Sequence, residues 1–160
     1  MYKAIVVTAV AVTATVALAG GAAAATRTSS SDHSKHFTVV EHAVTDTTAD
    51  TGPVGDSLGD VLAFGNPIYD AADHKQIGSD QGSCIRTKVG AAYECSWTTI
   101  LPGGSLVVEG PFYDAGDSTV AVIGGTGKYS GAGGSMRLHY RNKAGTEFDF
   151  SFDLSHSRTD

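Results

Sequence analysis

The C-terminal part of the chain has the clearest alternation of apolar and polar residues. Apolar side chains occupy every second position: Phe148, Phe150, Phe152 and Leu154, with Glu147, Asp149, Ser151 and Asp153 between them. Met136, Leu138 and Tyr140 alternate in the same way with Arg137, His139 and Arg141. A period of two gives a β-strand one dry and one wet face. Because residues 142–145 can form the turn between them, the two segments predict a β-hairpin.

Six further short apolar runs predict the remaining strands. They are separated by Gly, Pro, Asn and Asp, and cover residues 37–44, 59–64, 84–88, 93–100, 105–109 and 118–123. None of them has a helical period. About eight short strands without helices are typical of an all-β barrel or sandwich, and periodicity alone does not separate the two. A closed barrel removes exposed strand edges, which suits a small exported chain.

Residues 1–25 have the layout of a secretory signal peptide. Lys3 is the only charge, residues 4–18 are largely apolar, and Ala23, Ala24 and Ala25 form a small-residue cleavage motif. The alternative is a membrane anchor, but threonines interrupt the apolar run. We therefore expect a secreted protein with no stable membrane span after processing. Residues 26–36, rich in Ser, Thr and charge, predict a flexible lead-in, and residues 37–157 a single domain.

The charge balance is acidic and argues against two classes of partner. The formal net charge is −6, and loss of Lys3 with the leader changes it to −7. Nucleic acids and anionic membranes attract basic surfaces, so neither is an expected partner. No metal site is expected, because His33 and His36 lie in the lead-in without a cluster of cysteines or carboxylates.

Two cysteines in an exported chain favour a disulfide. Cys84 and Cys95 lie eleven residues apart and flank residues 89–92, where a turn would place them on neighbouring strands. A bridge across so short a loop contributes roughly 3 kcal/mol in the chain-entropy description. The alternative is that Cys84 is a free, reactive thiol.

Several segments together resemble a known family. They are residues 59–70, Gly82-Ser83-Cys84, residues 108–112 and residues 122–129. These segments resemble the allene oxide cyclases, and the Gly124–Gly127 block followed by residues 130–134 is also similar to plant dirigent proteins. The resemblance extends from about Val40 to Leu154. It implies a single eight-stranded antiparallel β-barrel with a ligand cavity inside, and it suggests trimers.

The resemblance also implies site residues. Glu41 matches the first-strand glutamate of the cyclases and is the candidate to stabilise developing charge or to steer proton transfer. Asn66 matches the cavity asparagine that helps to hold a water against the substrate oxygen. Pro53 and Phe64 are the candidate ligand-binding residues. The alternatives are a solvated strand glutamate for Glu41 and an ordinary turn residue for Asn66.

Two departures from the cyclase pattern concern the site itself. Ala43 stands where the family has an asparagine, and Cys84, a match for a cavity cysteine, is expected to be oxidised with Cys95. An oxidised cysteine offers neither a thiolate nor a proton.

Two function classes follow from these observations. In the first, a secreted barrel binds a small apolar reactive intermediate and directs its cyclisation or coupling stereochemistry without a cofactor. In the second, the same barrel is non-catalytic and either binds a hydrophobic ligand or serves a purely structural role.

Overall fold

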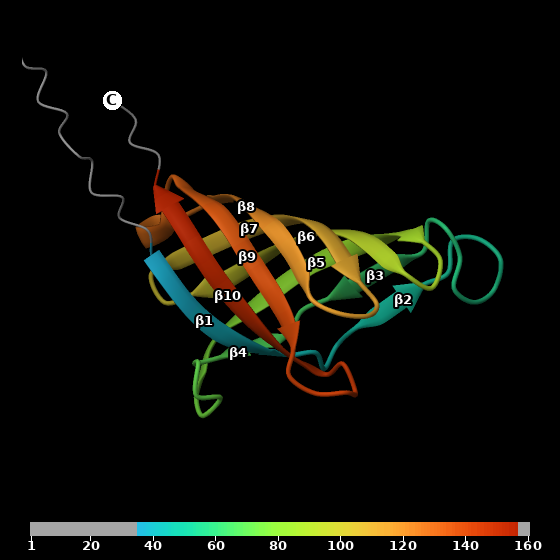
Figure 1. The fold of residues 1–160 in the computed structure, drawn as a ribbon, viewed down its shortest axis with the longest axis horizontal. Helices are drawn as coiled ribbons and strands as arrows, with labels where there is room; N and C mark the ends of the chain where they lie inside the picture. Colours follow the sequence, from blue (N-terminus) through green and yellow to red (C-terminus); the bar gives the residue numbers. More distant parts are fainter. Residues whose placement is uncertain (1–34, 157–160) are drawn as a thin grey trace, which may run out of the picture. The chain divides into compact units, whose positions relative to one another are not determined.

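A computed structural model describes residues 35–156, and these residues form an antiparallel β-barrel (Figure 1). The strands are β1 (Lys35–His42), β2 (Thr47–Ala49), β3 (Val61–Phe64), β4 (Pro67–Tyr69), β5 (Gln76–Lys88), β6 (Ala92–Leu101), β7 (Gly104–Tyr113), β8 (Ser118–Gly125), β9 (Ala132–Tyr140) and β10 (Glu147–His156). A single 3-10 turn, η1 (Gly127–Tyr129), lies between β8 and β9. No helix within this part of the chain is long and apolar enough to cross a membrane.

Ten strands occupy eight positions around the barrel because two positions are interrupted. β1 pairs with β4 and β10, whereas β2, which follows β1 along the chain, pairs with β3. β3 and β4 both pair with β5, at residues 82–85 and 76–79 respectively. The pairing of β5 with β6 closes the ring. The predicted all-β, eight-stranded antiparallel barrel is therefore confirmed, and the alternative of an open sandwich is excluded.

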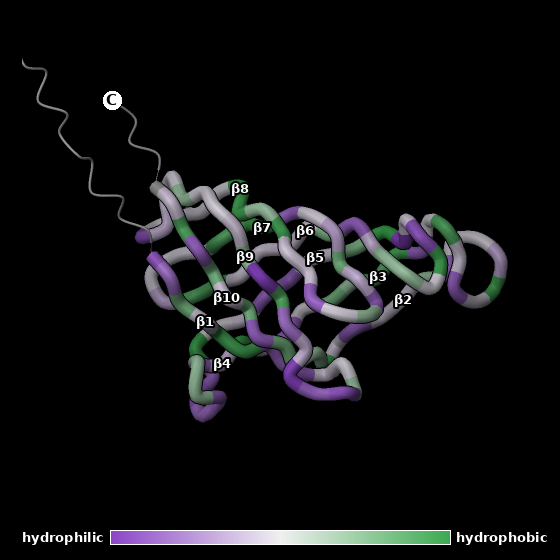
Figure 2. The backbone as a smooth tube through the Cα atoms, in the orientation of Figure 1, coloured by the Kyte–Doolittle hydropathy of each residue, from purple (hydrophilic) through white to green (hydrophobic). Residues whose placement is uncertain are grey.

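The alternating pattern sets which side chains fill the interior. Phe148, Phe150, Phe152 and Leu154 of β10 are all buried. The predicted β9–β10 hairpin is present, and its register pairs Phe150 with Leu138. Figure 2 shows the hydrophilic residues gathered in connections such as β4–β5 and β9–β10, while apolar and polar residues follow each other along the strands. The core is thus the inner face of the barrel, as a period of two requires.

All eight predicted strands are found, but their bounds differ in places. β5 begins at Gln76 rather than Cys84, and its first half, residues 76–83, is rich in polar residues and glycine, so it has no apolar run. Gly78 and Gly82 lie inside the strand, where the neighbouring strand comes close. β2 and β4, each three residues long, were not predicted. The predicted signal peptide lies outside the described residues, as does most of the lead-in; its last two residues, Lys35 and His36, belong to β1.

Gly82 allows the barrel wall to close tightly over Trp97. A Cβ atom at Gly82 would lie 2.3 Å from the Cβ of Trp97 and 2.5 Å from the carbonyl oxygen of Ser96. Gly82 and Trp97 are direct partners in the β5–β6 pairing. The missing side chain thus makes room for the large indole on the opposite strand.

We predict that Gly82→Ala destabilises the barrel by about 1–3 kcal/mol, because the added methyl group must push β5 and β6 apart. The free energy of unfolding from urea titration measures this. Gly124→Ala is the matched control, since a Cβ atom there meets nothing within 4 Å. Equal effects of the two substitutions would contradict the assignment.

Candidate functional site

A cavity lies inside the barrel and has mostly apolar walls. Its lining residues are Glu41, Asp46, Leu62, Phe64, Cys84, Cys95, Trp97, Phe112, Leu138, Phe148 and Phe150. Its volume, counted as the space open to the centres of water-sized molecules, is about 50 Å³. A single water needs roughly 10–15 Å³ on that measure, so the cavity has room for a few waters. A lipid-sized ligand would have to displace side chains.

Glu41 points into this cavity from β1. Glu41 is only 5% exposed and lines the cavity, and Val39, two positions earlier on the same face of the strand, is buried as well. The carboxyl group therefore lies on the inward face of β1. The alternative of a solvated strand glutamate is therefore wrong. Phe64 also lines the cavity, where its ring meets Trp97 edge-on with the centroids 6.3 Å apart.

Asn66 lies between β3 and β4 and uses its whole side chain on protein partners. Its Oδ1 accepts hydrogen bonds from the Val44 and Thr45 backbone amides and the Thr45 hydroxyl, each at 3.0 Å. Its Nδ2 donates to Glu41 Oε1 at 2.8 Å and to Asp46 Oδ1 at 2.9 Å. An amide has two N–H donors, and both are occupied by carboxyl groups. In this arrangement Asn66 orients Glu41 and has no N–H left for a water.

Asp80 is a third carboxyl group at this place, and the sequence analysis missed it. It is 2% exposed, and its Oδ1 accepts the Asn66 backbone amide at 3.0 Å. Its Oδ2 is buried and accepts no hydrogen bond from an amide or hydroxyl group of the described residues. Asp80 shares the inward parity of Cys84 on β5, so a longer predicted strand would have identified it. Asp46 lies in a loop and had no such signal.

Burial raises the pKa of two carboxyl groups of this cluster, Glu41 and Asp80. Desolvation, followed by the negative charge of Asp80, raises the pKa of Glu41 well above its usual range. Desolvation also raises the pKa of Asp80, to about 6, although a hydrogen bond from Glu41 opposes the rise. The raised pKa favours the neutral, protonated form of Glu41 relative to that of an exposed glutamate. The cavity thus contains a buried carboxyl group that holds its proton more strongly than a carboxyl group in water does.

The disulfide forms part of the cavity wall. Cys84 and Cys95 are direct cross-strand partners on β5 and β6, bonded to each other and each 3% exposed. The predicted disulfide is confirmed, and the alternative of a free Cys84 thiol is wrong. Trp97 follows Cys95 by two residues on the same face.

Pro53, in contrast, is not brought to the cavity. It is exposed in the β2–β3 connection and is not among the lining residues. Ala43, which replaces the family's asparagine, is half-buried at the end of β1 and offers no polar group. Within residues 35–156, no group of three or more His, Cys, Asp or Glu side chains is arranged to hold a metal ion.

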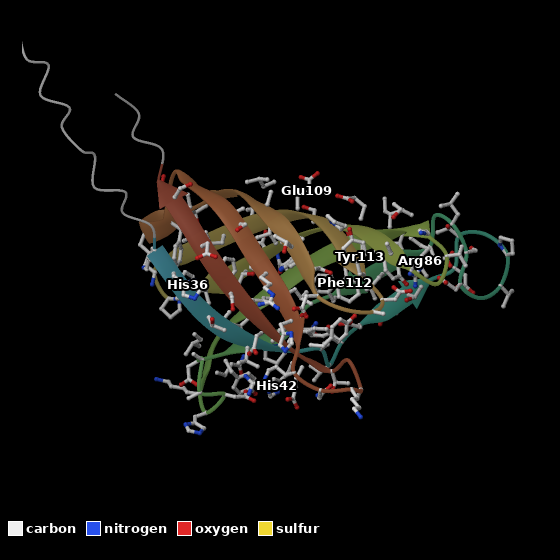
Figure 3. The ribbon with its side chains drawn as sticks, in the orientation of Figure 1. His36, His42, Arg86, Glu109, Phe112 and Tyr113 are labelled. Carbon is white, nitrogen blue, oxygen red and sulfur yellow. A yellow bond between two sulfur atoms is a disulfide. The ribbon has the colours of Figure 1, made fainter. Side chains whose placement is uncertain are left out.

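Arg86 lies at one end of the barrel and forms ion pairs with two aspartates. Arg86 Nη1 lies 2.7 Å from Asp114 Oδ1, its Nε lies 2.6 Å from Asp56 Oδ1, and its guanidinium stacks 3.6 Å from the centroid of Tyr93. Figure 3 shows Arg86 at the same end of the barrel as Phe112 and Tyr113. The positive charge of Arg86 is thus neutralised by two carboxylates, and Arg86 is not among the residues that line the cavity.

Comparison with known proteins places this architecture in a family. Residues 40–145 match the sequence profile described as allene oxide cyclase. The chain belongs to the allene oxide cyclase family.

Solved structures of the same fold belong to proteins with several different functions. A pyocyanin demethylase is similar at 23% identity with a TM-score of 0.63, covering 72% of this chain and 98% of that one. A pterocarpan synthase dirigent protein is similar at 17% identity with a TM-score of 0.67, covering 79% and 90%. A Diels–Alderase from Streptomyces koyangensis is similar at 13% identity with a TM-score of 0.62, covering 82% and 72%. At these identities the likeness establishes the fold.

We predict that the barrel loses stability as the pH rises through the range in which the pair ionises. The folded pKa values of Glu41 and Asp80 lie above those of the unfolded chain, near 4. Their contribution to the free energy of unfolding is therefore complete below about pH 4 and is lost through pH 6 and above. In Glu41→Gln the loss should be shallower, as measured by urea unfolding at about pH 5 and pH 8.

The control for this experiment is Glu109→Gln, because Glu109 is exposed on β7 and projects away from the barrel (Figure 3). It should keep the wild-type slope of stability against pH. A Glu41→Gln slope equal to that of the wild type would rule out a raised pKa for the buried Glu41.

We predict that reduction of Cys84–Cys95 lowers the free energy of unfolding by about 3 kcal/mol, because it removes the restraint on an eleven-residue separation. Intact mass after alkylation should show no labelling until reductant is added. Labelling of either cysteine in the native, unreduced protein would refute the bridge.

Proposed function

We propose that the cavity binds a small, largely apolar reactive intermediate and directs its cyclisation or coupling. The observation that carries this proposal is the buried carboxyl group of Glu41, which lines an aromatic cavity and has a raised pKa. Membership of the allene oxide cyclase family supports it, as does the fold shared with a dirigent protein and a Diels–Alderase.

Glu41 acts as the proton donor in this mechanism. It gives its proton to an epoxide oxygen of the bound intermediate as a C–O bond of the epoxide breaks, or to a carbonyl oxygen. Electrons of the adjacent π bonds then form the new ring bond. The proton leaves the resulting hydroxyl group, which becomes a carbonyl, and returns to the Glu41 carboxylate. The net change is an isomerisation that needs no other reactant. Asn66 and Asp80 act through Glu41: the amide fixes the direction of its carboxyl group, and the negative charge of the aspartate raises its pKa. The aromatic walls supply orientation, which contributes to the rate and to the stereochemistry.

The proposal covers the general class and not the plant reaction in particular. Ala43 removes a polar group that the family pattern places near the substrate oxygen, and the oxidised Cys84 provides no thiol. In this chain Glu41 is therefore the group proposed to bind the substrate oxygen.

The small cavity supports a second candidate function, a non-catalytic barrel that holds a hydrophobic ligand or serves only as a stable fold. With room for a few waters, the interior is closer to a packed core than to an open binding site. Under this alternative the acid cluster is structural, and Asn66 serves only to join the strand breaks.

We also propose that the protein acts outside the cytoplasm. The Cys84–Cys95 disulfide supports this location, since such bonds persist in oxidising compartments. The trimer that the family resemblance suggests remains a prediction, which sedimentation of the purified protein would test.

The experiment measures product formation by the wild-type protein, Glu41→Gln and Glu109→Gln. The substrates are unstable epoxides, which cyclise, and radical intermediates, which couple. We expect Glu41→Gln to lower the rate about 100-fold, the lower range for loss of a general acid, and to reduce the stereochemical excess seen by chiral chromatography. Glu109→Gln should match the wild type. A wild type that leaves product distribution unchanged would favour the non-catalytic alternative.

A further inference from the structure

The walls of the cavity are dominated by aromatic rings. Phe64, Trp97, Phe112, Phe148 and Phe150 are five of its eleven lining residues, and they come from β3, β6, β7 and β10. Their rings surround the space at several angles: Phe112 meets Phe148 edge-on with centroids 6.2 Å apart, and Trp97 is tilted against Phe150 at 5.9 Å. Aromatic faces carry negative partial charge and attract both the edges of other rings and cations.

The ionisable groups of the lining are all acidic. Glu41 and Asp46 contribute carboxyl groups, and none of the described lysine, arginine or histidine residues is among the lining residues. Arg86, at the barrel end, is already paired with Asp56 and Asp114. An anionic ligand would therefore enter the barrel without a counter-charge, whereas a cation would meet ring faces and a carboxylate.

Asp46 is placed to supply that counter-charge. It is exposed in the break between β1 and β2, yet it lines the cavity and accepts a hydrogen bond from Asn66 at 2.9 Å. The cavity thus reaches the surface beside a fixed carboxylate. A ligand can keep its positive end near Asp46 while its rings lie among Trp97, Phe148 and Phe150.

We propose that the natural ligand of this cavity is a planar aromatic molecule that carries a delocalised positive charge, and not an acidic lipid. The inference rests on the proposed function, since it concerns the ligand of the same site. An aromatic ring system is flat and offers a large area for stacking. Because its charge is spread over many atoms, such a cation is less strongly hydrated than a small ion and loses less on leaving water.

The test uses three probes of one shape and different charge: N-methylquinolinium, naphthalene and 2-naphthoate. Binding is measured by isothermal titration calorimetry on the wild-type protein. Quenching of Trp97, the single tryptophan of the chain, reports entry into the cavity. We expect N-methylquinolinium to bind about tenfold more tightly than naphthalene, consistent with a partly desolvated cation–aromatic contact, and 2-naphthoate to bind most weakly.

Asp46→Asn tests the counter-charge, because asparagine can still accept the hydrogen bond from Asn66. It should reduce the preference for the cation about threefold or more. The control is Asp153→Asn, which makes the same change of net charge on the exposed face of β10 beside His36; it should leave the preference within about twofold.

The outcomes separate the two proposals. If 2-naphthoate or naphthalene quenches Trp97 and binds more tightly than the cation, the ligand class is wrong while the binding cavity stands. Cation binding without quenching of Trp97, or an unchanged preference in Asp46→Asn, also overturns the ligand class. If none of the three probes binds, both the ligand class and the binding cavity of the proposed function are refuted.

Discussion

One side-chain amide connects the two interrupted positions of this barrel. Asn66 lies in the break between β3 and β4, and its side chain bonds to residues 44–46 in the break between β1 and β2. Its backbone is tied to Asp80 on β5 through bonds in both directions. These contacts pair the backbone amides of Val44 and Thr45 and fix the loop between β1 and β2 against the barrel wall. The same amide orients Glu41, so the strand breaks and the chemistry have a common support.

The interior combines a densely packed core with a costly polar cluster. Three carboxyl groups surround Asn66, and burying even one charge is unfavourable unless it is paired or neutralised. The raised pKa of Glu41 lowers part of this cost, because it favours a neutral carboxyl group that Asp80 does not repel. Aromatic packing around Trp97 and the Cys84–Cys95 disulfide stabilise the barrel and offset the unfavourable burial of this cluster. The fold thus retains a destabilising polar cluster, and this cluster contains the carboxyl group that faces the cavity.

The alternation of residues was sufficient to predict most strands, and it failed where glycine and short segments hide the period. β10 and β9 were predicted from Phe148 and Met136 because every second residue is apolar over a full strand. β5 was predicted too short because residues 76–83 are rich in polar residues and glycine; Gly78 and Gly82 lie in the strand, where β6 comes close. β4 was missed because Pro67 follows Asn66 and looks like a turn. Local signals of this kind cannot report a contact with a strand far along the chain.

By itself, the sequence determined the strand periodicity and the resemblance to the family, and it favoured the pairing of Cys84 with Cys95. It placed Glu41 on the same face as Val39 and left open whether that face is the inner one. These follow from local alternation, from matching motifs and from the chemistry of an exported thiol pair. Only the tertiary structure decided that Glu41 faces the cavity, that Asn66 donates both N–H groups to carboxyl groups, that Asp80 lies buried beside them, and that Pro53 stays outside the cavity. The reason is physical: hydrogen bonding and pKa depend on which groups meet in a low-dielectric interior, and the closure of β5 on β6 brings those groups together.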